Sequence, residues 1–174
     1  NIAFYSKNKN TFYDRTIRLN TSGLTACEEP TAYLPVVSAP RVERLSGALS
    51  DDTAAAIAAR AYEGEKSEYV VISRDDTYYD ALSGAGLAGA LGAPILLTGT
   101  SGLSGACRSA VESLGATKAV VLGGENAVSG QVVSELEAMG LSVERVAGDD
   151  VYGTSMACTR YLLAHGGSQR YAIA

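Results

Sequence analysis

Three acidic residues gather in the stretch RDDTYYDALS (residues 74–83), which gives the sequence its most direct candidate for chemistry. Asp75 and Asp76 follow a short apolar segment, and Asp80 stands at the start of a helical pattern. If the apolar segment is a parallel strand, these carboxylates and Thr77 lie at the carboxyl edge of a sheet, where open α/β sheets bind ligands. The same side chains could instead cap the helix N-terminus. We favour capping, and the two roles can coexist.

A glycine turn in LGGENAVS (residues 122–129) is the second candidate. Gly123 and Gly124 follow another apolar segment and precede another helical pattern. Glycines there allow the backbone to approach a ligand or to adopt positive φ, and free amides from Ser129 onward could hold an anion. A tight strand-to-helix turn needs the same glycines, so we favour the structural role unless polar ligand groups meet at the turn.

A third glycine motif, GAGLAG, fits the dinucleotide-binding pattern G-x-G-x-x-G through Gly84, Gly86 and Gly89. That pattern works when its first glycine lies in the turn directly after a strand. Here the preceding apolar segment ends near Ser73, about ten residues earlier, so the motif falls inside a predicted helix. We expect the small side chains to let this helix approach the sheet closely.

Two arginines occupy matching places, because Arg44 precedes a Ser-Gly and Arg145 an Ala-Gly. A guanidinium could clamp a phosphate or carboxylate with two hydrogen bonds, or it could pair with an aspartate of the same fold. We favour the internal ion pair, with Arg44 kept as a candidate ligand contact.

Residues suited to covalent or metal chemistry are few. His165, the one histidine, follows a helical pattern and is placed to cap a helix C-terminus. Cys27, Cys107 and Cys158 match no metal-ligand spacing, and Cys107 shares an apolar helical face. A Ser-His-Asp arrangement through space stays open, but no G-x-S-x-G motif accompanies it. We expect no catalytic residue, metal or cofactor.

Composition narrows the classes of partner. The 174 residues carry a net charge of -5, which argues against broad attraction to nucleic acid or anionic membranes. No stretch approaches the about 18 uninterrupted apolar residues of a membrane helix. The sequence starts at Asn1 without a signal-peptide pattern, so any such peptide would lie outside it.

Helices and strands alternate from residue 41 onward, which predicts an α/β fold: a mostly parallel sheet flanked by helices in three layers, of the Toprim or Rossmann type. Residues 1–40 read as a strand-rich or irregular flank and linker. The predicted strands are Tyr69–Ser73, Pro94–Leu97, Lys118–Leu122, Val143–Val146 and Tyr171–Ala174, and the predicted helices are Asp52–Tyr62, Tyr79–Leu91, Ser104–Leu114, Ser129–Met139 and Thr154–Leu163.

A long-period repeat links the two ends of this region. The segment from Val42 aligns without a gap with the segment from Val143, an offset of 101 residues (143 − 42). Such a period suggests tandem domains rather than a solenoid of short units. The identical pairs are Val42/Val143, Glu43/Glu144, Arg44/Arg145, Gly47/Gly148, Thr53/Thr154, Ala56/Ala157, Ser67/Ser168 and Ile72/Ile173.

An ordered set of segments resembles the cell wall binding repeat 2 family of Gram-positive surface proteins. These segments are RLSG at 44–47, VVIS at 70–73, YDALSGAGLAG at 79–89, LGAPILLT at 91–98, LGATKAVVLGGENAVS at 114–129 and VERVAGDD at 143–150. The resemblance implies an α/β module, usually in three tandem copies with pseudo-threefold assembly, that holds a protein noncovalently on an anionic cell-wall polymer. It also associates the apolar segment Pro94–Leu97 with polymer binding.

We therefore expect a noncatalytic, secreted module that attaches a surface protein to an anionic or teichoic-type wall polymer. In this interpretation residues 41–141 form a complete copy, and residues 142–174 begin a second copy that packs on the first sheet. Neighbouring repeats or further copies of the chain are expected partners. The predicted polymer-binding residues lie on the PILL segment, at the sheet's carboxyl edge or before the Ser-Gly: Pro94, Ile95, Leu96, Leu97, Thr98, Asp80, Gly123, Gly124 and Arg44.

Two alternatives stay open. A hydrolase or phosphate-handling α/β enzyme would use Asp75, Asp76 and Asp80, and would bind a divalent metal there. A self-assembly module would use the face that tandem copies must pack together.

Overall fold

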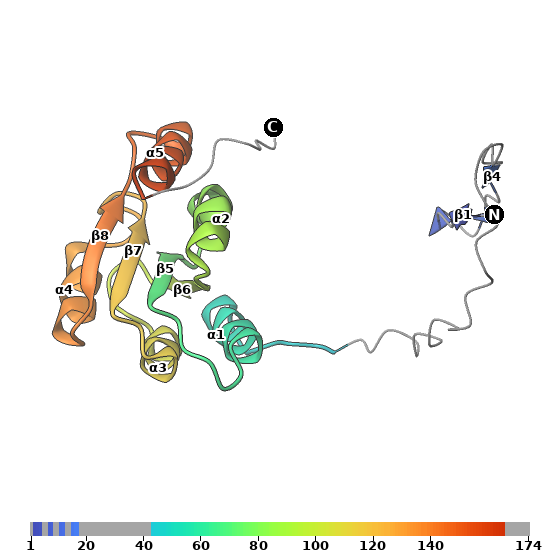
Figure 1. Cartoon of the computed structure of the whole chain (residues 1–174). Coiled ribbons are helices and arrows are strands. Elements are labelled where there is room, and N and C mark those ends of the chain that lie inside the picture. Colours follow the sequence, from blue (N-terminus) through green and yellow to red (C-terminus); the bar gives the residue numbers. More distant parts are fainter. Residues whose placement is uncertain (1, 5–6, 9–10, 13–14, 18–42, 166–174) are drawn as a thin grey trace. The chain divides into compact units, whose positions relative to one another are not determined.

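The computed structural model describes residues 2–4, 7–8, 11–12, 15–17 and 43–165, which belong to two compact units divided between residues 42 and 43 (Figure 1). In the first unit, β1 (Ile2–Phe4) pairs antiparallel with β4 (Arg15–Ile17), and β2 (Lys7–Asn8) pairs antiparallel with β3 (Thr11–Phe12). These short strands agree with the predicted strand-rich flank.

The second unit is built on a parallel four-stranded sheet with the order β6-β5-β7-β8. Its strands are β5 (Tyr69–Arg74), β6 (Ile95–Thr98), β7 (Lys118–Leu122) and β8 (Ser142–Val146). Four predicted strands are therefore confirmed to within one residue at each end. The fifth predicted strand, Tyr171–Ala174, lies outside the described residues.

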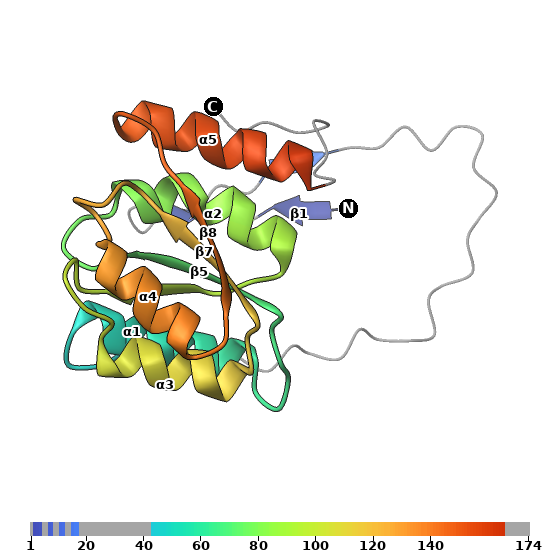
Figure 2. The same ribbon diagram turned by 90° about the vertical axis from the view of Figure 1, so that its left-hand side faces the viewer.

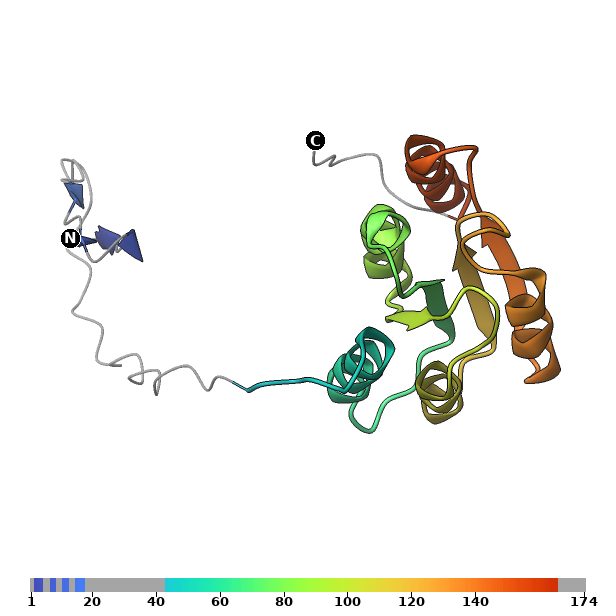
Figure 3. The same ribbon diagram turned by 180° about the vertical axis from the view of Figure 1, so that it is seen from behind.

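Five helices cover the two faces of this sheet: α1 (Ser50–Ala61), α2 (Tyr79–Leu91), α3 (Gly105–Leu114), α4 (Gly130–Ala138) and α5 (Val151–Ala164). Helices α1, α3 and α4 pack on one face, and α2 and α5 pack on the other (Figure 2). The view from behind shows the same three layers (Figure 3). The predicted α/β class is confirmed. None of the helices in the described ranges is long and apolar enough to cross a membrane.

The sequence of the central strand β5 is largely apolar because both of its faces are buried. Val70 and Ile72 of β5 belong to the core beneath α1 and α3, while Val71 belongs to the core beneath α2 and α5. All three side chains are fully buried. A strand covered by helices on both faces cannot carry polar residues at alternate positions without burying them.

One glycine of the GAGLAG motif allows the close packing predicted for it. Gly84 of α2 faces Leu122 at the end of β7, and a Cβ atom at position 84 would overlap the Leu122 side chain. At Gly86 and Gly89 a Cβ atom would meet nothing within 4 Å, so the same prediction is wrong for these two positions. The motif lies inside the helix, and only its first glycine serves packing.

The repeat has a structural counterpart in the loops before α1 and α5. The Gly47 amide donates to Thr53 Oγ1 over 2.9 Å, and the Gly148 amide donates to Thr154 Oγ1 over 3.3 Å. At both glycines an added Cβ atom would collide with the first turn of the helix that follows. Aligned residues therefore make the same local structure.

Candidate functional site

The carboxyl ends of the parallel strands form one edge of the sheet, and two hollows open there. The first has a volume of about 320 Å³ and lies beside the ends of β5 and β6. The second has a volume of about 270 Å³ and lies beside the ends of β5, β7 and β8. The first is lined by Ser50, Asp75, Asp76, Thr77, Tyr78, Ala81 and Leu97, and the second by Arg74, Asp80, Gly123, Gly124, Glu125, Asn126, Ala127, Gly148, Asp149, Asp150, Val151 and Thr154.

An ion pair separates the two hollows. Arg74 lines the second hollow and Asp76 the first. The guanidinium binds the carboxylate with two hydrogen bonds, Nε to Oδ1 and Nη2 to Oδ2, the latter over 2.6 Å. The hydrogen bond from Arg74 lowers the pKa of Asp76, and the same bond raises the pKa of Arg74. This cation is therefore already engaged by the protein.

The predicted capping of α2 is wrong. Its N-cap residue is Tyr78, which has no side-chain capping hydrogen bond. Asp76 pairs with Arg74, and Asp75 and Thr77 line the first hollow while Asp80 lines the second. The three carboxylates proposed for an enzyme thus divide between two hollows. Among the described residues no group of three or more acidic, histidine or cysteine side chains could hold a metal ion.

Asp80 is the most unusual residue of the edge. Its side chain is only 9% exposed, and it makes no hydrogen bond or ion pair with any other residue of the 43–165 region. It lies against the glycine turn, since a Cβ atom at position 123 would come within 2.8 Å of Asp80 Oδ2. Its oxygens are not fully buried and face the second hollow, where no protein group hydrogen-bonds to them, which makes this position a candidate contact for a ligand.

The structural role predicted for the glycine turn is confirmed at Gly123. Gly123 has a φ of 85°, a conformation that favours glycine, and an added Cβ would also come within 2.8 Å of Ala127 Cβ. At Gly124 an added Cβ would meet nothing within 4 Å. The predicted anion site at Ser129 has one amide fewer to offer, because the Ser129 amide donates to the Thr100 carbonyl.

The PILL segment divides between core and surface. Leu96 and Thr98 are fully buried, and Thr98 Oγ1 holds the following loop by accepting from the Ser104 amide over 2.9 Å. Ile95 and Leu97 are half-buried and line an apolar groove of about 440 Å³ between α1 and α2, together with Ala54, Ile57, Ala58, Ala61, Tyr62, Ala81, Ala93 and Pro94. Of the five predicted residues 94–98, only Leu97 also reaches a hollow of the carboxyl edge.

The two arginines have different surroundings. Arg145 donates through Nη1 to the Gly123 carbonyl over 2.7 Å, so it supports the glycine turn, and the ion pair predicted for it is wrong. Arg44 is exposed, lines neither hollow, and forms no ion pair with another residue in the 43–165 range. The structure therefore does not bring Arg44 to Asp80 or to the glycine turn.

The remaining reactive side chains lie away from the edge. Cys107 is buried, and burial raises the pKa of its thiol to about 12. His165 ends α5 as predicted, with its ring stacked on Tyr161 and Nδ1 2.8 Å from the Tyr161 carbonyl oxygen. The opposite end of α5 lines the second hollow. Cys27 lies outside the described residues.

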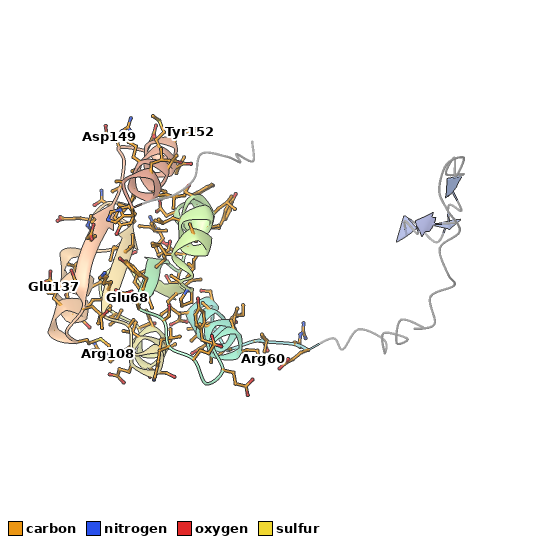
Figure 4. All side chains as sticks on the ribbon, in the orientation of Figure 1. Arg60, Glu68, Arg108, Glu137, Asp149 and Tyr152 are labelled. Atoms are coloured by element: carbon orange, nitrogen blue, oxygen red, sulfur yellow. The ribbon has the colours of Figure 1, made fainter. Side chains whose placement is uncertain are left out.

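Several residues of the hollows were not identified from sequence patterns. They are Arg74 as a partner of Asp76, Tyr78, Glu125, Asn126 and the pair Asp149 and Asp150 (Asp149 is labelled in Figure 4). Arg74 is the last residue of β5 and the others lie in segments just after a strand, and strand ends of a parallel sheet share one edge. Their position at strand ends was the sequence signal that could have identified them. With these residues included, the second hollow is rich in carboxylates, while the two arginines near it, Arg74 and Arg145, are already hydrogen-bonded to the protein.

Comparisons with known proteins agree on the kind of domain. The model of the cell wall binding domain 2 (CWB2) family matches residues 44–133. The N-acetylmuramoyl-L-alanine amidase LytC of Bacillus subtilis (strain 168) is 30% identical over 114 residues, which cover 66% of this chain and 23% of the amidase. The chain thus spans about a quarter of that relative.

Two solved structures from Clostridium difficile share the fold. Cwp6 superposes with a TM-score of 0.66 at 23% identity, over 75% of this chain and 22% of Cwp6. Cwp8 superposes with a TM-score of 0.62 at 29% identity, over 67% of this chain and 20% of Cwp8.

Proposed function

Because the chain belongs to the cell wall binding domain 2 (CWB2) family and is a cell wall binding module, we propose that its carboxyl edge holds a wall polymer noncovalently. The module would thereby keep the protein that contains it at the outer surface of a Gram-positive cell. It does so without catalysis, since binding needs only complementary hydrogen bonds and shape.

The observation that carries this proposal is the Asp80 carboxylate. It is buried, has no protein hydrogen-bond partner in the 43–165 region, and borders a hollow of about 270 Å³. A hydroxyl group of a sugar in the hollow would donate to this carboxylate in place of the solvent that reaches it there. In the glycine turn beside it, the Gly123 amide and carbonyl already bind Val146 and Arg145, whereas the Gly124 amide has no partner in the 43–165 region and offers a further donor.

The charges of the second hollow define which part of the polymer makes contact. Asp80, Glu125, Asp149 and Asp150 line it, and the Arg74 guanidinium is paired with Asp76. Carboxylates repel phosphate groups, so we propose that an anionic or teichoic-type polymer binds through its hydroxyl-bearing sugar units. Binding should then depend only weakly on salt concentration, unlike binding that neutralises phosphates with free cations.

The first hollow would extend the contact along the same edge. Its Tyr78 side chain is exposed, and its ring centroid lies 4.4 Å from that of Tyr79. Leu97 lines both this hollow and the apolar groove. An aromatic ring together with an apolar side chain suits the less polar face of a sugar ring. This arrangement gives the PILL segment a part in binding through Leu97.

A wall-polysaccharide pull-down tests the proposal. Asp80→Asn removes the charge and half of the acceptors at nearly constant shape, and we expect binding at least about tenfold weaker. Glu137→Gln, on the exposed side of α4, is the matched control and should bind as the wild type does. Unchanged binding by a folded Asp80→Asn variant would remove the second hollow as the site.

A further inference from the structure

The rim of the second hollow carries more negative charge than the fold requires. Glu125, Asp149 and Asp150 are exposed residues that line it. Asp150 has a structural role, because its Oδ1 accepts from the Gly153 amide over 2.7 Å and thereby caps α5. The side chains of Glu125 and Asp149 form no hydrogen bond or ion pair with any residue between 43 and 165. No protein group in that range neutralises these two charges.

The repeat shows that the loop before α5 does not need Asp149. The glycine–threonine hydrogen bond in this loop also forms in the loop before α1. There the counterparts of Asp149 and Asp150, 101 residues earlier (149 − 48), are Ala48 and Leu49. The same local structure therefore forms without either carboxylate, and the fold does not explain the charge of Asp149.

Asp80 lines the same hollow from a more buried position. It is 9% exposed, and no group from residues 43–165 hydrogen-bonds to its carboxylate. The first turns of α2 and α5 contribute residues to the hollow, and their positive ends offset part of the negative charge. Arg74, the one guanidinium among the described lining residues, gives its Nε and Nη2 to Asp76. The Asp80 carboxylate is therefore available to a ligand group that enters between the rim carboxylates.

A cation with N–H donors fits this arrangement better than a metal ion does. A metal ion such as Ca²⁺ draws its ligands to within about 2.5 Å of one point, and no group of acidic, histidine or cysteine side chains in the described ranges is placed to do so. A primary ammonium has three N–H donors and binds each carboxylate over about 2.8 Å, so carboxylates that stand further apart can share it. A carboxylate accepts several hydrogen bonds, so Asp80 can bind an ammonium and a neighbouring hydroxyl group together.

We propose that the polymer unit in the second hollow carries a primary ammonium group beside its hydroxyl groups, held by Asp80 together with Glu125 and Asp149. This inference rests on the proposed function and names the class of polymer, an anionic chain that also carries free amines. Such an amine belongs either to an amino sugar without an N-acetyl group or to an aminoacyl group in ester linkage. The hollow would recognise the ammonium that both share. An ammonium at Asp80 is partly enclosed, where salt screens an ion pair little, so the expected salt dependence stays weak.

The pull-down with chemically modified wall polysaccharide tests this inference. N-acetylation in aqueous solution removes the positive charge of every primary amine, and the wild type should bind the acetylated polymer at least about tenfold more weakly than untreated polymer. The double variant Glu125→Gln, Asp149→Asn changes two exposed residues and should fold. It should bind untreated polymer more weakly and reduce the difference between the two forms to about threefold or less. Glu137→Gln is the matched control and should keep the wild-type difference.

Mild alkali distinguishes the two sources of the amine, because it cleaves aminoacyl esters and leaves amino sugars intact. Once N-acetylation has weakened binding, an equal loss after alkali assigns the ammonium to an aminoacyl ester. Unchanged binding after alkali assigns it to an amino sugar.

Two outcomes would overturn the inference. One is equal binding of N-acetylated and untreated polymer by the wild type, and the other is the same loss on N-acetylation in the wild type and in the double variant. In either case the effect of Asp80→Asn on untreated polymer still decides the proposed function separately. If the wild type binds no form of the polymer, the proposed function fails and this inference fails with it.

Discussion

The PILL segment and the Asp80 hollow differ in how far the protein itself accounts for their residues. Leu96 and Thr98 are buried, and their contacts with the core and the following loop explain both side chains. Asp80 is slightly more exposed, at 9%, and its carboxylate faces the second hollow, where no side chain or backbone group of the 43–165 region hydrogen-bonds to it. A residue explained by packing needs no ligand, whereas a carboxylate that faces an open hollow is free to accept hydrogen bonds from one. The comparison therefore favours the hollow over most of the PILL segment as the binding site.

The largest expected effect concerns the packed side of this comparison. Leu96→Ala should lower the free energy of unfolding by about 2–5 kcal/mol, because it leaves a cavity in the core beneath α1 and α3. Urea unfolding measures the change. Leu97→Ala should cost clearly less because Leu97 is half-buried. Equal losses at both positions would contradict the division of this segment into core and surface.

The glycine turn gives the next largest effect. Gly123→Ala should cost at least about 1 kcal/mol, because it forces a side chain into positive φ and crowds Asp80 Oδ2. The same change at Gly124 meets open space and is the matched control. Thermal melts compare the two variants. Equal melting temperatures would show that the turn does not require glycine at position 123.

The strands and the helix ends could be predicted from the sequence because each depends on residues close together in the chain. The apolar runs at 69–73 and 118–122 determine buried parallel strands, because only a sheet covered on both faces accepts them. The limits of the helices follow from glycines such as Gly92, with a φ of 60°, and Gly115, with a φ of 63°. Local sequence was therefore sufficient for the fold.

The site depended on contacts between distant segments. Whether Asp76 caps α2 or pairs with Arg74 depends on the side-chain positions of both, and the capping pattern alone favoured the wrong partner. The surroundings of Asp80 include the backbone of Gly123, 43 residues along the chain (123 − 80). A sequence pattern does not indicate which hydrogen-bond partners a side chain will have, because those partners come from distant segments.

The buried core should make the free energy of unfolding depend on pH through the thiol of Cys107. Burial raises the pKa of Cys107 from 9.0 to about 12, so the folded protein keeps a proton that the unfolded chain loses above pH 9. Stability from this group is complete below pH 9 and is lost as the pH rises toward 12. At pH 10 the loss should be about 1.4 kcal/mol. Urea unfolding at pH 8 and pH 10 should show a smaller decrease for Cys107→Ala, and an equal decrease would mean that the thiol is not buried.

The smallest expected effect sharpens the view of the first hollow. Tyr78→Ala should leave stability within about 0.5 kcal/mol, because the ring is exposed, and should weaken polymer binding only a few-fold. Tyr152→Ala on α5 is a matched control that removes another exposed tyrosine. If both variants bind the polymer as the wild type does, the first hollow is not part of the contact.

The central claim is that the Asp80 carboxylate receives a hydroxyl group of a wall polymer. Titration of the ¹⁵N-labelled protein with oligosaccharides released from purified wall polymer tests it most directly. The amide signals of Gly123, Gly124 and Asn126 should shift in the wild type and stay in place in Asp80→Asn, while signals from the apolar groove change little. Shifts confined to the groove beside Ile95, with none at the glycine turn, would contradict the account.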